Sequence, residues 1–215
     1  MKWQSDYNPE DNNLTDREVF TKIWSEPRRV FKFIDQSGYG KYGFYLLCLV
    51  GIARAFDKAI EKNWGDDMSL WTVLATCIFV GGLFGWISLY IYSFFISWSG
   101  NWLKGEANSD TILRIMTYSA IPTVAAMVLL VYQISIYGNE VFQEQNEIEN
   151  TSIVSYPLFL SLSILRFAFG IWSFVLLVIG VSEVQKFTVG KALLNVLLPF
   201  LVLLVPILIV VFVFM

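Results

Sequence analysis

The residues best suited to chemistry are three charged side chains that lie in apolar sequence. Arg54 and Asp57 stand three residues apart in the stretch "GFYLLCLVGIARAFDKAI", and Arg166 interrupts a later apolar run. Residues at this spacing share one helical face, so Arg54 is expected to pair with Asp57. Charges inside a membrane helix are functional candidates by default. This cluster could be an internal ion pair beside an arginine that reaches toward the surface. It could also line a polar cavity for an anionic solute or headgroup.

Two acids are the next candidates. Glu106 and Glu183 each lie in a short polar segment between apolar runs. If their carboxylates converged on one reacting atom, they could act as general acid and base. The chain has no histidine, which removes imidazole bases, serine–histidine triads and His-x-x-x-His zinc sites. An intramembrane enzyme is therefore the last of our hypotheses, and we predict no catalytic residue, metal or cofactor.

The segment "GVSEVQKFTVGKALLNV" places Glu183, Lys186 and Lys191 between two uncharged runs. We interpret it as a cytoplasmic turn, with both lysines at the inner headgroups. An acid near the bilayer is costly unless it is paired. Lys186, three residues after Glu183, or a basic residue of the N-terminal region could serve as the partner. The turn, with Glu106 in the preceding cytoplasmic turn, is thus predicted to hold the N-terminal helices.

Apolar runs define the elements that must position these residues. Apolar residues make up 56% of the chain and charged residues only 15%, which is typical of a membrane protein. A helix needs roughly 20 apolar residues to cross the hydrocarbon core. We therefore predict an all-α, polytopic integral membrane protein. Its five transmembrane helices are expected at about 43–60, 70–98, 112–137, 156–181 and 192–215, and they form one domain over 43–215.

The basic residues predict the orientation. Seven lysines and arginines precede Gly43, whereas the long loop at 138–155 contains four glutamates and no basic residue. The positive-inside rule then places the N-terminus in the cytoplasm and the C-terminus outside. The first forty residues contain no apolar signal-peptide core, so the first span is expected to act as the insertion signal.

The N-terminal region is expected to be disordered over 1–14 and to form amphipathic helices over 15–42. Thr15 and Glu18 have the spacing of a capping box. In the second helix the apolar residues share one face, and the polar side carries Arg28, Arg29 and Lys32. This helix could lie on the inner leaflet against anionic lipids, or it could pack on the ends of the spans. The sequence leaves both possibilities open.

Two glycines predict a close helix contact. Gly81 and Gly85 have the G-x-x-x-G spacing, which lets two helix backbones approach closely. The contact could form a dimer face, so a homo-oligomer remains possible. In a protein with five spans, an internal contact is the favoured interpretation.

Three stretches resemble the Yip-domain family of Ypt/Rab-interacting multipass membrane proteins. They are "IWSEPRRVFKFI", "GNWLKGEANSDTILRIMTYSAIP" and "GVSEVQKFTVGKALLNVLLP". The likeness covers most of the chain after about residue 20. It implies a non-enzymatic protein that acts through protein or lipid contacts in membrane organisation or trafficking-like processes. The alternative is a small transporter or channel with a midplane polar cavity around Arg54, Asp57 and Arg166.

The chain also departs from the eukaryotic pattern of that family. Its N-terminal region is short, and the Asp-Leu-Tyr-Gly-Pro type of motif before the first span is absent. A Rab-type GTPase is therefore not expected as a partner. The chain is more similar to the bacterial members, which implies the inner (plasma) membrane. The expected partners are the lipid bilayer, including anionic lipids, and a protein partner or a second copy, but no nucleic acid.

Overall fold

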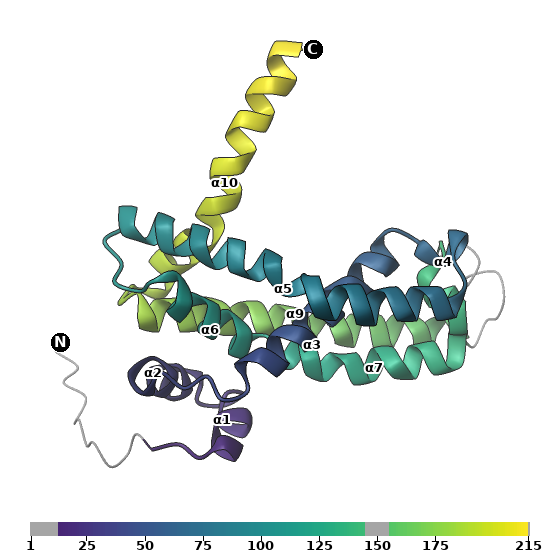
Figure 1. Cartoon of the computed structure of the whole chain (residues 1–215), viewed down its shortest axis with the longest axis horizontal. Helices are drawn as coiled ribbons and strands as arrows, with labels where there is room; N and C mark the ends of the chain where they lie inside the picture. Colours follow the sequence, from purple (N-terminus) through teal and green to yellow (C-terminus); the bar gives the residue numbers. More distant parts are fainter. Residues whose placement is uncertain (1–12, 145–154, 215) are drawn as a thin grey trace.

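The computed structural model of the chain describes residues 13–144 and 155–214, without the side chains of 155 and 203–214. The described chain is almost entirely helical and contains no strand (Figure 1). The predicted all-α fold class is thus confirmed. The elements are α1 (Asp16–Lys22), α2 (Pro27–Ser37), α3 (Gly43–Glu61), α4 (Trp64–Asp67), α5 (Leu70–Trp102), α6 (Ser109–Ser119), α7 (Ile121–Tyr137), η2 (Gly138–Phe142), α9 (Ser155–Val184) and α10 (Val189–Phe214).

Long apolar helices dominate the structure. Three helical segments are long and apolar enough to cross a membrane: Leu70–Trp102, Ser109–Phe142 and Tyr156–Val184. Every range predicted as a span contains a helix. Within the described residues, however, α3 and α10 do not have the combination of length, hydropathy and low charge that the three segments have. For α3 the reason is its charge, because four of its 19 residues are charged. The membrane-spanning fold is therefore established, whereas the count of five spans stays a prediction.

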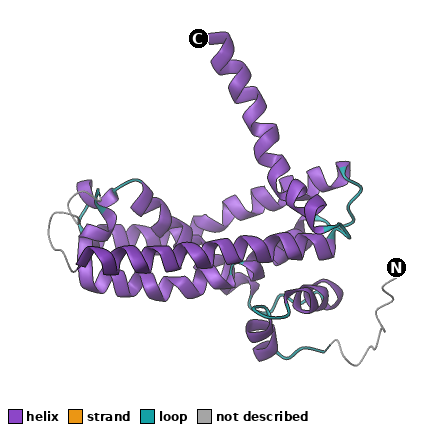
Figure 2. Ribbon diagram, turned by 180° about the vertical axis from the view of Figure 1, so that it is seen from behind, coloured by secondary structure: helices purple, strands orange, loops and turns teal. Residues whose placement is uncertain are grey.

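The long helices run side by side and create two distinct ends. The α5–α6 and α9–α10 turns lie at the same end as α1 and α2, while α4 and η2 lie at the opposite end (Figure 1). We call the first the basic end (residues 13–42, 103–114 and 182–191) and the second the acidic end (58–67 and 138–144). The helix α10 starts against α5 and α9 at the basic end and then leaves the bundle at a steep angle (Figure 2).

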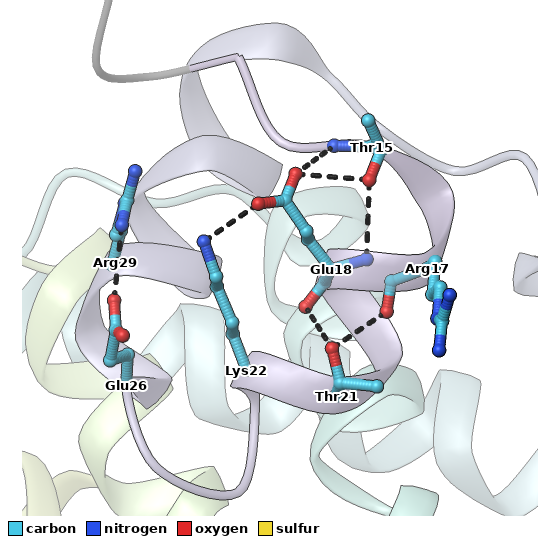
Figure 3. Close-up of polar contacts among 7 residues, drawn as sticks. All are labelled: Thr15, Arg17, Glu18, Thr21, Lys22, Glu26 and Arg29. Atoms are coloured by element: carbon cyan, nitrogen blue, oxygen red, sulfur yellow. Dashed lines mark hydrogen bonds and ion pairs between the residues drawn. The ribbon is translucent and has the colours of Figure 1, made fainter.

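The N-terminal helices begin as the sequence predicts. The hydroxyl of Thr15 accepts a hydrogen bond from the Glu18 amide, and the Glu18 carboxylate accepts one from the Thr15 amide at 2.9 Å (Figure 3). The capping box is thus confirmed. Lys22 adds an ion pair to Glu18 at 2.7 Å. These bonds lower the pKa of Glu18 to about 2, and the bond from Lys22 contributes most. One turn later, Pro27 opens α2 at a position where its missing N–H costs nothing.

The second helix is docked on the bundle by its apolar face. Val30, Phe31 and Ile34 are fully buried, and α2 packs mainly against α9, with further contacts to α6. The first helix is tied in through Asp16, whose carboxylate accepts bonds from the hydroxyls of Tyr39 and Tyr42 and from Lys41. These contacts, with Lys41 first, hold the pKa of Asp16 below its usual value. The sequence left two positions open for α2, the inner leaflet and the ends of the spans. The described structure shows α2 packed on the ends of the spans.

Candidate functional site

A polar cluster joins α3, α7 and α9. The carboxylate of Asp57 on α3 pairs with Arg166 on α9 at 2.8 Å. Arg166 also donates to the side-chain oxygen of Gln133 on α7 at 3.2 Å. Gln133 is fully buried, and its amide donates to the Phe159 carbonyl at 3.2 Å and to the Ser163 hydroxyl at 3.0 Å. Each polar side chain of this cluster therefore has a partner on a neighbouring helix.

Arg54 has a different partner from the one predicted. Its guanidinium donates to the Ser88 hydroxyl on α5 at 3.1 Å, whereas Asp57 pairs with Arg166. The predicted ion pair between Arg54 and Asp57 is therefore wrong. Three residues turn an α-helix by about 300°, which leaves the two side chains about 60° apart. That divergence directs one side chain to α5 and the other to α9. The two charges still interact electrostatically, because Asp57 lies within the field of both arginines.

A cavity of about 340 Å³ adjoins this cluster. Its walls come from α3, α7 and α9 alone, and two of the three predicted charges, Asp57 and Arg166, line it. Most of the surrounding surface is apolar. The lining residues are Ala53, Asp57, Ile60, Thr123, Ala126, Met127, Leu130, Phe159, Ser163, Arg166, Phe167 and Gly170.

At the basic end, the α9–α10 turn contacts α2 through two ion pairs. Glu183 lies 3.8 Å from Arg28, and Lys186 lies 3.8 Å from Asp35. Glu183 thus has its basic partner in the N-terminal region, one of the two options expected from sequence. The side chain of Lys186 also donates to the Glu183 carbonyl at 2.9 Å, and Lys191 stands 4.2 Å from the centre of the Phe187 ring.

The remaining basic residues of α2 also lie at this end. Arg29 pairs with Glu26 at 3.2 Å (Figure 3), and Lys32 is half-buried. Each of these two residues also makes a further contact. The polar side of α2 is thus a basic surface that borders the ends of the bundle.

The two acids proposed for catalysis are differently placed. Glu106 is exposed in the segment between α5 and α6, while the carboxylate of Glu183 faces Arg28. Within residues 13–144 and 155–214, no ion pair or hydrogen bond joins Glu106 to Glu183 or to a basic side chain. The same residues contain no group of three potential metal ligands.

Two uncharged amides form a site that was not predicted from the sequence. Gln185, 1% exposed, accepts a bond from the Ala107 amide at 3.0 Å, which ties the α9–α10 turn to the α5–α6 turn. Asn195 is fully buried and donates to the Ile96 carbonyl at 3.0 Å and to the Ser99 hydroxyl at 2.8 Å. The signal in the sequence is an amide within or beside an apolar run. A search for charged residues does not find such an amide. Gln133 was not predicted for the same reason.

The glycine pair lies in an internal contact. A Cβ on Gly81 would overlap α3 at Ala55 and Gly51, and a Cβ on Gly85 would overlap the Gly51 backbone. Ser88, one turn beyond Gly85, receives the hydrogen bond from Arg54. The close approach of α3 and α5 therefore also sets the position of Arg54.

The comparison with protein families agrees with the resemblance seen in the sequence. Residues 21–211 match the family model described as the Yip1 domain, a range that contains all the sites described above. No curated protein and no solved structure matches the chain. Because the match covers most of the chain and the membrane-length helices agree with it, the chain belongs to the Yip1 domain family of multipass membrane proteins.

Proposed function

We propose that this chain is a non-enzymatic Yip-type protein that acts through contacts with lipids or proteins in membrane organisation or trafficking-like processes. The main support is that each charged side chain of the intramembrane cluster has a polar partner within the protein. Asp57 and Arg166 neutralise each other, Gln133 holds Arg166, and Ser88 holds Arg54. Groups with partners on neighbouring helices need no solute to satisfy them, which is expected of a scaffold.

We further propose that the basic end faces the cytoplasm and that the C-terminus lies outside. The described basic end carries ten basic and seven acidic residues, whereas the described acidic end carries two basic and five acidic residues. This asymmetry follows the positive-inside rule. We also propose a bacterial-type member in the inner membrane, without a Rab-type GTPase as partner, because residues 13–42 contain no motif of the Asp-Leu-Tyr-Gly-Pro type.

The contact that the geometry favours is with anionic headgroups of the inner leaflet. The docked helix α2 holds Arg29 and Lys32 beside the ends of the spans, which is the level of the headgroups. Basic residues at this level contribute about 1 kcal/mol each to the attraction of an anionic membrane surface. A docked α2 can therefore contact the bundle with one face and the lipid surface with another.

This contact predicts a loss of bound anionic lipid in the double variant Arg29→Gln/Lys32→Gln. Native mass spectrometry would count the phosphatidylglycerol molecules that the purified protein retains. We expect the double variant to bind this lipid on the order of tenfold more weakly than the natural chain. The matched control is Lys58→Gln/Lys62→Gln, which removes the same charge at the acidic end and should leave retention at the basic end unchanged. Equal losses in the two double variants, or no loss in either, would contradict the proposal.

The cavity supports a second candidate, a small transporter or channel. Two of the charges expected to line a midplane pathway, Asp57 and Arg166, do line the cavity between α3, α7 and α9. Arg54 is not among the lining residues. A solute pathway requires water in this cavity, whereas a lipid contact requires hydrocarbon at its mouth. An enzyme that uses Glu106 and Glu183 is the least supported of the three, because Glu183 is paired with Arg28.

A further inference from the structure

The cavity beside Asp57 and Arg166 opens in the middle of a membrane-length helix. Phe167 and Gly170 line it, and both are exposed, Phe167 to 71%. Both lie more than ten residues from either end of α9. At a rise of 1.5 Å per residue, this places them about 15 Å or more from each end. A mouth at that depth opens sideways into hydrocarbon rather than upward into water.

The charged cluster beside the cavity carries one excess positive charge. Arg166 and Asp57 line the cavity as an ion pair, and Arg54 lies outside the lining, one turn before Asp57 on α3, so the cluster has two guanidinium groups and one carboxylate. A guanidinium has five N–H donors. The bonds of Arg166 to side chains in the described part of the chain use two of its nitrogens, one for Asp57 and one for Gln133. An oxyanion in the cavity would receive further donors from Arg166 and would balance the excess positive charge.

The arrangement of the walls separates a polar part from an apolar part. The helices α7 and α9 pack against each other and run in opposite directions, so Gly170 lies beside the early residues of α7. The guanidinium of Arg166 reaches the other way, toward Gln133 near the end of α7. Between Arg166 and Gly170 the lining is largely apolar, with Met127, Ala126 and Phe167. An occupant would thus place a charged group at Arg166 and an apolar chain along these residues.

We propose that this cavity is a lateral binding site for a long-chain fatty acid, with its carboxylate at Arg166 and its chain along α7 and α9. Charge complementarity selects the anionic head, and the opening into hydrocarbon selects an amphiphile. The volume of about 340 Å³ is at the small end of the range for small-molecule sites, which suits one acyl chain better than two. This inference rests on the proposed function, in which lipid is the contact partner, but it concerns different residues.

The test is photolabelling of the full-length protein in nanodiscs with a diazirine derivative of palmitate. We expect the adduct to map to peptides that contain Met127 and Phe167, and unlabelled palmitate to compete. Hexadecanol has the same chain without the charge and should compete about tenfold less well, because it lacks a charge-assisted bond. Competition by hexadecanol equal to that by palmitate would overturn the proposal. Competition by phosphatidylglycerol in place of palmitate would identify a phospholipid phosphate as the occupant and would also overturn it.

Two variants locate the label. Arg166→Gln should reduce labelling about tenfold, whereas Arg114→Gln, an arginine at the basic end, should leave it unchanged. Should Arg166→Gln fail to fold, Gly170→Leu provides a second test. A Cβ at Gly170 meets no other atom within 4 Å, so a leucine has room at this wall of the cavity and leaves both charged groups in place. Labelling that persists in Gly170→Leu would contradict the site. Retention of phosphatidylglycerol at Arg29 and Lys32 is measured separately, so either proposal can fail alone.

Discussion

Replacement of Gly85 by alanine should separate α3 from α5. A Cβ at Gly85 would overlap the Cα, carbonyl carbon and oxygen of Gly51, and backbone atoms cannot move aside as a side-chain tip can. We expect the free energy of unfolding to fall by about 1–3 kcal/mol, the usual cost of overpacking. The midpoint of thermal unfolding of the purified protein in detergent would measure the loss.

A neighbouring glycine provides the matched control. A Cβ at Gly82 would lie 3.5 Å from the side chain of Ile52, which is an ordinary contact, so Gly82→Ala should be tolerated. Both variants make the same chemical change on the same helix, three residues apart. Equal unfolding midpoints for Gly85→Ala and Gly82→Ala would contradict the close contact of α5 with α3.

Replacement of Asp57 by leucine should destabilise the protein strongly, because it leaves Arg166 without its counter-charge. The Arg166 side chain is only 16% exposed, and its guanidinium lies 2.8 Å from Asp57. Breaking a buried ion pair by removing one partner typically costs about 3–5 kcal/mol. Asp57 itself is 58% exposed, so we expect the lower end of that range. The midpoint of thermal unfolding of the Asp57→Leu variant, compared with that of the natural chain, would measure the loss.

The double variant Asp57→Leu/Arg166→Leu distinguishes an ion pair from a general packing defect. Two apolar side chains need no counter-charge, and such replacements are often neutral or stabilising. The double variant should therefore recover most of the stability that Asp57→Leu loses. A loss of stability in the double variant equal to or larger than the sum of the losses in Asp57→Leu and Arg166→Leu would show that the two residues do not act as a pair.

The sequence predicts the elements well because their signals are local. Uncharged runs locate the helices, and the spacing of Thr15 and Glu18 predicts the cap of α1. The contact of Gly85 is only half predictable, since its partner Gly51 belongs to another helix and the spacing of Gly81 and Gly85 does not say which helix that is.

The partners of the charged side chains are harder to predict. A shared helical face suggested that Asp57 pairs with Arg54, but the side chains diverge and a third helix supplies Arg166. For Glu183 the sequence predicts that a basic partner is needed. Which residue supplies it, here Arg28, depends on how α2 packs against the bundle. Buried amides such as Gln133 carry no charge, so predictions based on charge do not find them.

Solvent access to the cavity distinguishes contact with lipid from passage of a solute. A nitroxide would be attached at Gly170→Cys in a chain without Cys48 and Cys77, with reference labels at Phe174→Cys and Glu144→Cys. Phe174 is exposed one turn further along α9, and Glu144 is exposed beyond η2 at the acidic end. Collision rates with oxygen, which concentrates in hydrocarbon, would be compared with those of a water-soluble nickel chelate. We predict that the label at position 170 collides with oxygen and avoids the nickel chelate, as the label at 174 should. Collision with the chelate as frequent as at position 144 would mean a water-filled cavity and would contradict the account.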